Sequence, residues 1–130
     1  MERVNRESGE WKEVVPGFHH KTLAVGDMMS MQAFKIDPTG NYGSKHKHVN
    51  AQMMYVSEGI GLHFVEFDET GEEVTAEYEV PPGESVYIPS ETYHNAVNCG
   101  DEPVFGIDVF CPPRANATPS YMTVDSTDEE

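Results

Sequence analysis

The chain has 130 residues, of which 23 are acidic and 8 are basic, and its formal net charge at pH 7 is -15. A field of this sign repels nucleic acid and anionic lipid surfaces, so we expect neither as a partner. The length and the 38% apolar content suit one domain with a single hydrophobic core, and exclude two independent cores.

The first ten residues are polar and charged, and we expect them to be frayed. They lack the apolar run of a secretory signal peptide. No stretch of about eighteen apolar residues occurs elsewhere either, so the sequence predicts no membrane-spanning helix. We therefore expect a soluble, cytoplasmic protein.

Short apolar segments separated by turn residues follow, and no helical periodicity continues for three turns. The candidate strands are residues 22–25, 28–36, 62–67, 74–80, 85–88 and 104–111. Gly26 and Asp27 separate the first two, residues 37–40 have the composition of a tight turn, and Gly71 suits a hairpin. In residues 74–80 the apolar side chains alternate with polar ones, which predicts one face on the core and one in water.

Strands of this number and length, together with those that carry the motifs below, predict an all-β fold. Eight or more antiparallel strands in one domain are typical of a double-stranded β-helix, the jelly-roll barrel, whose closed interior can hold a ligand. We expect a single domain over residues 1–130, with its core at about 15–114 and an acidic tail from about residue 120. Cys99 and Cys111 form no close-spaced pattern, which favours two reduced, partly buried thiols.

Two segments carry candidate metal ligands: GSKHKHVNAQMMYVSEG at residues 43–59 and GESVYIPSETYHNAVN at residues 83–98. Successive side chains of a strand alternate between its faces, so His46 and His48 point the same way, and Gln52 joins them if the strand is unbroken. His94 then arrives from a second strand. Three imidazole nitrogens and one amide oxygen form a ligand set that Ni, Mn, Fe, Zn and Co all accept.

A single histidine in a polar strand is more often a solvated side chain than a ligand, and this alternative applies to the remaining histidines. His19, His20 and His63 have no ligand spacing around them, and we expect them to be structural or surface residues. The four candidate ligands are all neutral, which leaves the full charge on a divalent ion. Gln52 in place of a glutamate therefore favours Lewis-acid chemistry over the stabilisation of a higher oxidation state.

The segment DVFCPPR, residues 108–114, supplies further candidate groups. Asp108 and Phe110 share one strand face, and if this face lines the barrel interior, Asp108 lies near the metal as a proton donor or acceptor. Phe110 then forms an apolar wall, and Arg114 can hold a carboxylate with a bidentate fork. The plainer alternatives are a strand-end acid, a core phenylalanine and a surface charge.

The paired motifs, His-x-His with a polar ligand four residues later and Gly-x5-Pro-x4-His-x3-Asn, resemble those of the cupin superfamily. Gln52, the run QMMYVSEG and the ending Asp-x-Phe-x-Pro-Pro-Arg extend this resemblance to the small single-domain cupins of the KdgF type, the pectin-degradation proteins. It covers about residues 15–114. It implies a metal held by His46, His48, Gln52 and His94, with Asp108, Phe110 and Arg114 as the catalytic residues.

The activity that this resemblance implies is the conversion of a cyclic 4,5-unsaturated uronate into its linear keto acid. Ala51 and Glu91 depart from the family pattern, and both leave the substrate in doubt. Two other functions stay open: a metal-dependent dioxygenase and a non-catalytic cupin that binds a small molecule. The resemblance and the need to protect edge strands also predict a homodimer. The acid-rich composition is typical of proteins from a high-salt cytoplasm, although an acidic protein from a low-salt cell remains an alternative.

Overall fold

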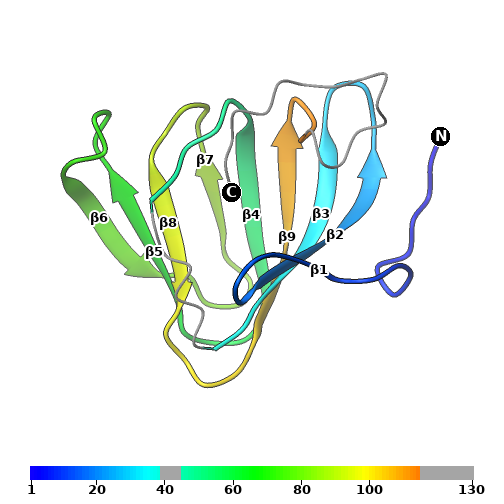
Figure 1. Ribbon diagram of the computed structural model, residues 1–130, viewed down its shortest axis with the longest axis horizontal. Coiled ribbons are helices and arrows are strands. Elements are labelled where there is room, and N and C mark those ends of the chain that lie inside the picture. The colour runs from blue at the N-terminus through cyan, green and yellow to red at the C-terminus, as the bar shows by residue number, and fades with distance from the viewer. Residues whose placement is uncertain (39–44, 115–130) are drawn as a thin grey trace.

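We describe a computed structural model of the chain over residues 1–38 and 45–114. These residues form nine strands and no helix (Figure 1). The strands are β1 Lys12–Val15, β2 Phe18–Val25, β3 Ser30–Ile36, β4 Ala51–Glu58, β5 Leu62–Phe67, β6 Val74–Glu79, β7 Ser85–Ile88, β8 His94–Asn98 and β9 Val104–Cys111. The predicted all-β fold is confirmed.

The strands form two antiparallel sheets that face each other (Figure 1). The larger sheet has the order β1-β2-β3-β9-β4-β7, and the smaller one has the order β6-β5-β8. β9 is the last strand in sequence, yet it pairs with both β3 and β4 in the middle of the larger sheet. This central place puts the side chains of β9 beside those of β3 and β4.

Strict alternation along β4 and β9 separates core side chains from outward ones. Met54 and Val56 on β4 are buried, whereas Met53 and Tyr55 between them are exposed. The buried apolar core is completed by Phe34, Ile36, Leu62, Phe64, Val80, Ile88 and Val104. Because both sheets contribute to this cluster, it packs their inner faces together, as in other two-sheet domains.

The inner face of the larger sheet holds apolar residues at one end and polar residues at the other. A glycine lies at the apolar end. Gly59, which follows β4, has a φ of +97°, a conformation that a side chain rarely adopts. A Cβ at this position would lie 2.4 Å from the carbonyl oxygen of Pro103. The glycine of the first motif therefore allows the chain to pass closely over the segment that precedes β9.

Several sequence predictions need correction. β3 begins at Ser30 instead of residue 28, and β1 and the first half of β2 were not predicted. Val74 is exposed although its alternation assigned it to the core, because β6 is an edge strand whose register with β5 shifts next to Val74. Cys99 and Cys111 are free thiols, as expected, but both are exposed rather than partly buried.

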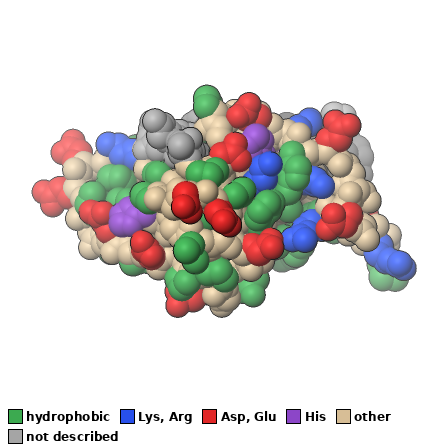
Figure 2. All heavy atoms as spheres, turned by 90° about the horizontal axis from the view of Figure 1, so that it is seen from below, with side chains coloured by type: hydrophobic (Ala, Val, Ile, Leu, Met, Phe, Trp, Pro, Cys, Tyr) green, Lys and Arg blue, Asp and Glu red, His purple; other side chains and the backbone are tan. Residues whose placement is uncertain are grey.

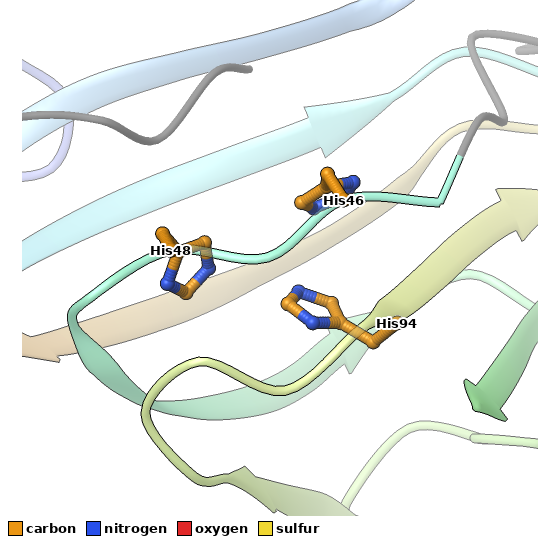
Figure 3. A group of neighbouring side chains, drawn as sticks. All are labelled: His46, His48 and His94. Atoms are coloured by element: carbon orange, nitrogen blue, oxygen red, sulfur yellow. The ribbon is translucent and has the colours of Figure 1, made fainter. Parts of the chain in front are cut away.

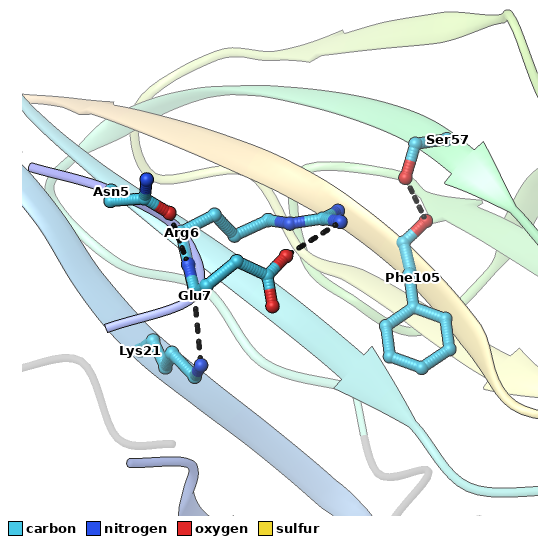
Figure 4. A network of polar contacts seen from close by, with 6 residues as sticks. All are labelled: Asn5, Arg6, Glu7, Lys21, Ser57 and Phe105. Atoms are coloured by element: carbon cyan, nitrogen blue, oxygen red, sulfur yellow. Dashed lines mark hydrogen bonds and ion pairs between the residues drawn. The ribbon is translucent and has the colours of Figure 1, made fainter. Parts of the chain in front are cut away.

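The segment before β1 lies against β2 and makes specific contacts there (Figure 4). Lys21 donates a hydrogen bond from Nζ to the carbonyl oxygen of Arg6 at 3.0 Å, and its ammonium lies 4.9 Å from the ring centroid of Trp11. Trp11 in turn packs against Phe105 of β9, with 6.2 Å between the ring centroids. The N-terminal residues thus cover one part of the outer face of the larger sheet.

Acidic side chains are scattered over the face of the molecule in Figure 2, between apolar ones. In the part of the chain that the structure describes, no helix is long and apolar enough to cross a membrane.

Candidate metal centre and pocket

Three histidines converge between the two sheets (Figure 3). His46 forms an isolated bridge with His94, the first residue of β8, through two backbone hydrogen bonds of 2.9 and 3.0 Å. His48 follows two residues later and is buried. The ring nitrogens that these residues can offer all lie within 4.8 Å of one another, so the three histidines could hold a metal ion.

The segment that carries His46 and His48 is not the unbroken strand that would place Gln52 on their face. Between the bridge at His46 and the start of β4 at Ala51, the chain bends. Gln52 nevertheless points inward, because it shares the inner face of β4 with Met54 and Val56. Gln52 therefore lies in the same pocket as the three histidines, although the condition of an unbroken strand is not met.

Backbone carbonyls fix the rings of two of these histidines. The Nδ1 atom of His48 lies 2.9 Å from the carbonyl oxygen of Asn50, and that of His94 lies 2.8 Å from the carbonyl oxygen of Thr92. A carbonyl only accepts hydrogen bonds, so Nδ1 is the donor in both rings. In the neutral imidazole, Nε2 is then the atom with the lone pair, which is the arrangement found in metal-binding histidines.

His94 is held in the neutral form that a metal ligand requires. Burial and then the neighbouring His46 lower its pKa to about 3, against the partial opposition of the hydrogen bond to Thr92. The charges of His48 and Arg114 act in the same direction as burial. At neutral pH a metal ion would therefore not have to displace a proton from the ring of His94.

Gln52 is oriented by the carboxylate next to it. Its Nε2 atom donates a hydrogen bond of 2.9 Å to Oδ1 of Asp108, which turns its Oε1 atom toward His48. This oxygen lies 3.1 Å from Nε2 of His48. An amide oxygen and the lone pair of a neutral imidazole are both acceptors, so they repel each other at this distance unless a cation lies between them.

The short distance between these two acceptors, Oε1 of Gln52 and Nε2 of His48, indicates that the site can bind a metal. Two ligand atoms at roughly 2.1 Å from one ion and about 90° apart would be about 3 Å from each other. The donor set of three imidazoles and one amide oxygen also suits a divalent transition metal better than Ca²⁺ or Mg²⁺, which prefer oxygen ligands.

The C-terminal part of β9 brings the other predicted residues to the same pocket. Asp108 and Phe110 are both buried on the inner face of β9, and the ring of Phe110 lies 5.8 Å from that of His48. The guanidinium carbon of Arg114 lies 4.4 Å from the ring centroid of Phe110. The backbone nitrogen of Arg114 donates a hydrogen bond of 3.2 Å to Oγ of Ser30. All seven predicted site residues therefore line one cavity.

This cavity has a volume of about 400 Å³ and is lined from both sheets. Beyond the predicted residues, its polar lining includes His20 of β2, Gln32 of β3 and Lys45. Two of the eight basic residues of the chain, Lys45 and Arg114, thus lie in this pocket of a strongly acidic protein. This local positive charge suits an anionic ligand.

The three remaining histidines differ from one another in their surroundings. His19 forms a 3.0 Å ion pair with Asp37, and His63 forms a 2.9 Å ion pair with Glu77, both in partly exposed positions. His20 is instead buried in the pocket wall, so of the two expected classes only the structural one remains. Gln32 was not predicted to line the pocket, although it shares the parity of the apolar Phe34 and Ile36.

The fold and the site define a small jelly-roll β-barrel with a candidate metal centre in its interior. Residues 32–110, more than half of the chain, match the family model described as Cupin domain, and the chain belongs to this family. No curated protein sequence matches the chain.

Solved structures share the fold. The structure of KdgF from Halomonas sp. has a TM-score of 0.76 and 23% identity, with 91% of this chain and 99% of that chain covered. An RmlC-like cupin from Shewanella frigidimarina has a TM-score of 0.71 and 23% identity, with coverages of 86% and 91%. The polyketide cyclase RemF from Streptomyces resistomycificus has a TM-score of 0.70 and 25% identity, with coverages of 85% and 79%.

Proposed function

We propose that this cupin is a metal-dependent enzyme that converts a cyclic 4,5-unsaturated uronate into its linear keto acid. The main observation behind the proposal is the hydrogen bond from Gln52 to Asp108, which links a proposed metal ligand to a proposed proton-transfer group. Both residues lie in a pocket that also contains Arg114. The likeness to KdgF in fold supports it.

His46, His48, Gln52 and His94 are the residues that would hold the metal. A bound divalent cation supplies positive charge that polarises an oxygen of the substrate and stabilises negative charge formed on it. The neutral ligands leave this charge undiminished, which favours the redox-neutral reaction.

Asp108 performs the proton transfers in this proposal. It accepts the proton of the 1-hydroxyl group while the bond between C1 and the ring oxygen breaks, so C1 becomes an aldehyde and the ring oxygen becomes an enolate at C5. Asp108 then returns a proton to C4, and the enolate becomes the C5 ketone. Atoms and electrons balance without any oxidant, because the product is an isomer of the substrate.

Arg114 holds the substrate's carboxylate at the end of the pocket nearest Phe110. Its guanidinium is stacked over the aromatic ring, which limits its motion and presents its donors to one direction. Phe110 is buried and excludes water from the adjacent carboxylate of Asp108. Lys45 adds a second positive charge to the pocket lining.

The test follows the absorbance of the double bond in an unsaturated monouronate that a polyuronate lyase has produced. We expect the metal-loaded protein to accelerate the loss of this absorbance, chelation to abolish the effect, and added metal to restore it. Absence of any acceleration by folded, metal-loaded protein would refute the proposed reaction, and oxygen uptake in the same sample would favour a dioxygenase.

Variants separate the metal from the rest of the pocket. His48→Ala and His94→Ala should lose most of the bound metal, measured by elemental analysis after gel filtration, because each removes one imidazole ligand. His63→Ala is the matched control, since His63 is partly exposed and its Nε2 atom lies 2.9 Å from Glu77, outside the histidine cluster. Full metal content in both ligand variants would show that the metal is held elsewhere.

A further inference from the structure

A band of polar side chains crosses the inner face of the larger sheet opposite the histidine cluster. His20, Gln32 and Asp108 lie on the adjacent strands β2, β3 and β9, and they are only 8%, 3% and 5% exposed. All three line the pocket. Their neighbours on the same face, Phe34 and Ile36, belong to the apolar core.

The strand register fixes the order of these groups along the pocket. Ser30, which binds the backbone of Arg114, is paired with Phe110, while Gln32 is paired directly with Asp108. Phe34 comes next on β3 and is paired with His20. Same-face residues of a strand are about 6.8 Å apart, so the pocket wall presents Arg114, then Gln32 beside Asp108, then His20, at successive steps of this length.

Polar side chains interrupt a sheet face whose other part is apolar core, and they do so where the face borders the cavity. Gln32 is paired directly with Asp108, and His20 lies one same-face step further along the wall. The ring of His20 is nearly parallel to that of Phe18, with 6.3 Å between centroids and 18° between planes. Both residues therefore present polar side chains to the same cavity as the candidate site.

We propose that His20 and Gln32 form a binding subsite for two adjacent hydroxyl groups of the substrate, C2–OH and C3–OH of the uronate ring. This inference rests on the proposed function. With the carboxylate on C5 held by Arg114, the C2–C3 edge is the opposite side of the pyranose ring and points along the wall toward these two residues. Imidazole and amide each donate and accept hydrogen bonds, as hydroxyl groups do.

The subsite makes these residues determinants of specificity. Unsaturated uronates from galacturonate polymers and from alginate have the same double bond and carboxylate, but differ in the configuration at C2 relative to C3. A pair of side chains that binds both hydroxyl groups distinguishes these two diols, because one hydroxyl group of the wrong epimer points away from the pair and its hydrogen bond is not formed.

The experiment compares the wild type with His20→Phe and Gln32→Met, which keep the stacking and the side-chain length but remove the hydrogen bonds. We expect KM to rise about tenfold for the preferred uronate with a smaller change in kcat, as for the loss of one hydrogen bond to a neutral group. The ratio of kcat/KM between the two uronates should move toward one. His20→Asn, which keeps a donor and an acceptor, should recover part of the loss.

Unchanged KM values and an unchanged ratio in variants that melt like the wild type would overturn the subsite. His63→Phe is the matched control for His20→Phe, because it makes the same change outside the pocket. All variants carry the four metal ligands, so equal metal content verifies that the centre is intact.

A binding measurement separates this inference from the proposed reaction. Titration calorimetry with galacturonate and with mannuronate, on zinc-loaded protein, needs no turnover. Binding that weakens in His20→Phe and Gln32→Met supports the subsite even if no ring opening occurs. Equal binding by wild type and variants overturns it while leaving the reaction in place, and no binding together with no turnover in the wild type overturns both.

Discussion

Asp108 occupies a position in which one carboxylate serves two purposes. Its Oδ1 atom accepts the hydrogen bond from Gln52 and thereby turns the amide oxygen of that residue toward His48. The same residue lines the pocket at the point where proton transfer is proposed. Substitutions at this residue can separate the two roles, since an amide keeps the acceptor but cannot transfer the proton.

We predict that Asp108→Asn retains metal affinity within a few fold, because the new amide oxygen still accepts from Gln52. Its activity should fall by about 10² to 10⁴, the usual contribution of a general acid or base. Asp108→Leu removes the acceptor as well, and its metal affinity should fall roughly 10- to 100-fold. Competition with a chromophoric chelator measures both affinities. Equal metal affinity in the two variants would show that Gln52 does not depend on Asp108 for its orientation.

Residue patterns in the sequence identified the candidate ligands because His46, His48 and His94 stand in motifs whose spacing is visible without a structure. Asp108, Phe110 and Arg114 were found through their common segment. His20 was not, because a single buried histidine in an alternating strand has no spacing partner. Its place in the pocket depends on the pairing of β2 with β3, which joins residues distant in sequence.

At the scale of the elements, Asn50 joins the histidine segment to the end of β9. It is fully buried, and its Nδ2 atom donates hydrogen bonds to the carbonyl oxygens of Pro112 and Pro113. Its own carbonyl accepts the hydrogen bond from Nδ1 of His48. One side chain and one carbonyl thus set the distance between a metal ligand and the segment that leads to Arg114.

We predict that Asn50→Ala lowers the free energy of unfolding by about 1–3 kcal/mol, because the carbonyl oxygens of Pro112 and of the buried Pro113 lose their donor. Metal affinity should fall as well, since His48 loses a fixed neighbour. Urea denaturation of the metal-free protein measures the first effect. Asn5→Ala is the matched control, with an expected change below about 0.5 kcal/mol, because Asn5 is exposed. An effect no larger than that of the control would remove Asn50 from this role.

The strands themselves were largely predictable, because all six candidate segments overlap strands of the structure. The irregular segment from His46 to Asn50 was not predictable from alternation. Its bend is fixed by tertiary contacts: the bridge to His94, and the hydrogen bonds of Asn50 to Pro112 and Pro113. Such contacts leave no periodic trace in the sequence, so alternation alone could not show whether the strand that carries His46 and His48 continues unbroken to Gln52.

At the scale of the whole molecule, the larger sheet carries an uncharged strip on its outer face. Two rows of paired residues cross β3, β9, β4 and β7 without an acidic side chain. The rows are Met31, Val109, Met53 and Tyr87, and Ala33, Ile107, Tyr55 and Ser85. Two copies with a net charge of -15 each repel one another, and a face free of acids offers the least repulsion to close approach.

We therefore predict that the expected homodimer associates through this face. Tyr87 is 59% exposed in the single chain, and Tyr87→Glu should convert the dimer to a monomer because it places a charge in the contact. Val74→Glu introduces the same charge at an exposed apolar position of β6 and should leave the dimer intact. Light scattering after gel filtration measures the mass. A monomeric wild type, or a dimer that survives Tyr87→Glu, contradicts the prediction.

The acidic surface also predicts how stability responds to salt. Like charges that folding brings together destabilise the native state, and added salt screens their repulsion. The melting temperature should therefore rise as KCl is raised from low to molar concentration, by roughly 4 °C for each kcal/mol of repulsion that is relieved in a domain of this size. Differential scanning calorimetry measures it on metal-free protein, which removes any effect of salt on metal binding.

A general effect of salt on apolar surface would raise the melting temperature as well, so a charge-reduced variant is required. Glu69→Gln, Glu79→Gln and Glu84→Gln together remove three exposed negative charges without touching the core or the pocket. If repulsion is the cause, this variant melts higher than the wild type at low salt, and the difference narrows as KCl increases. A difference that is absent at low salt, or that stays constant in molar KCl, would mean that the acidic surface does not limit stability, and that its charge serves solubility instead.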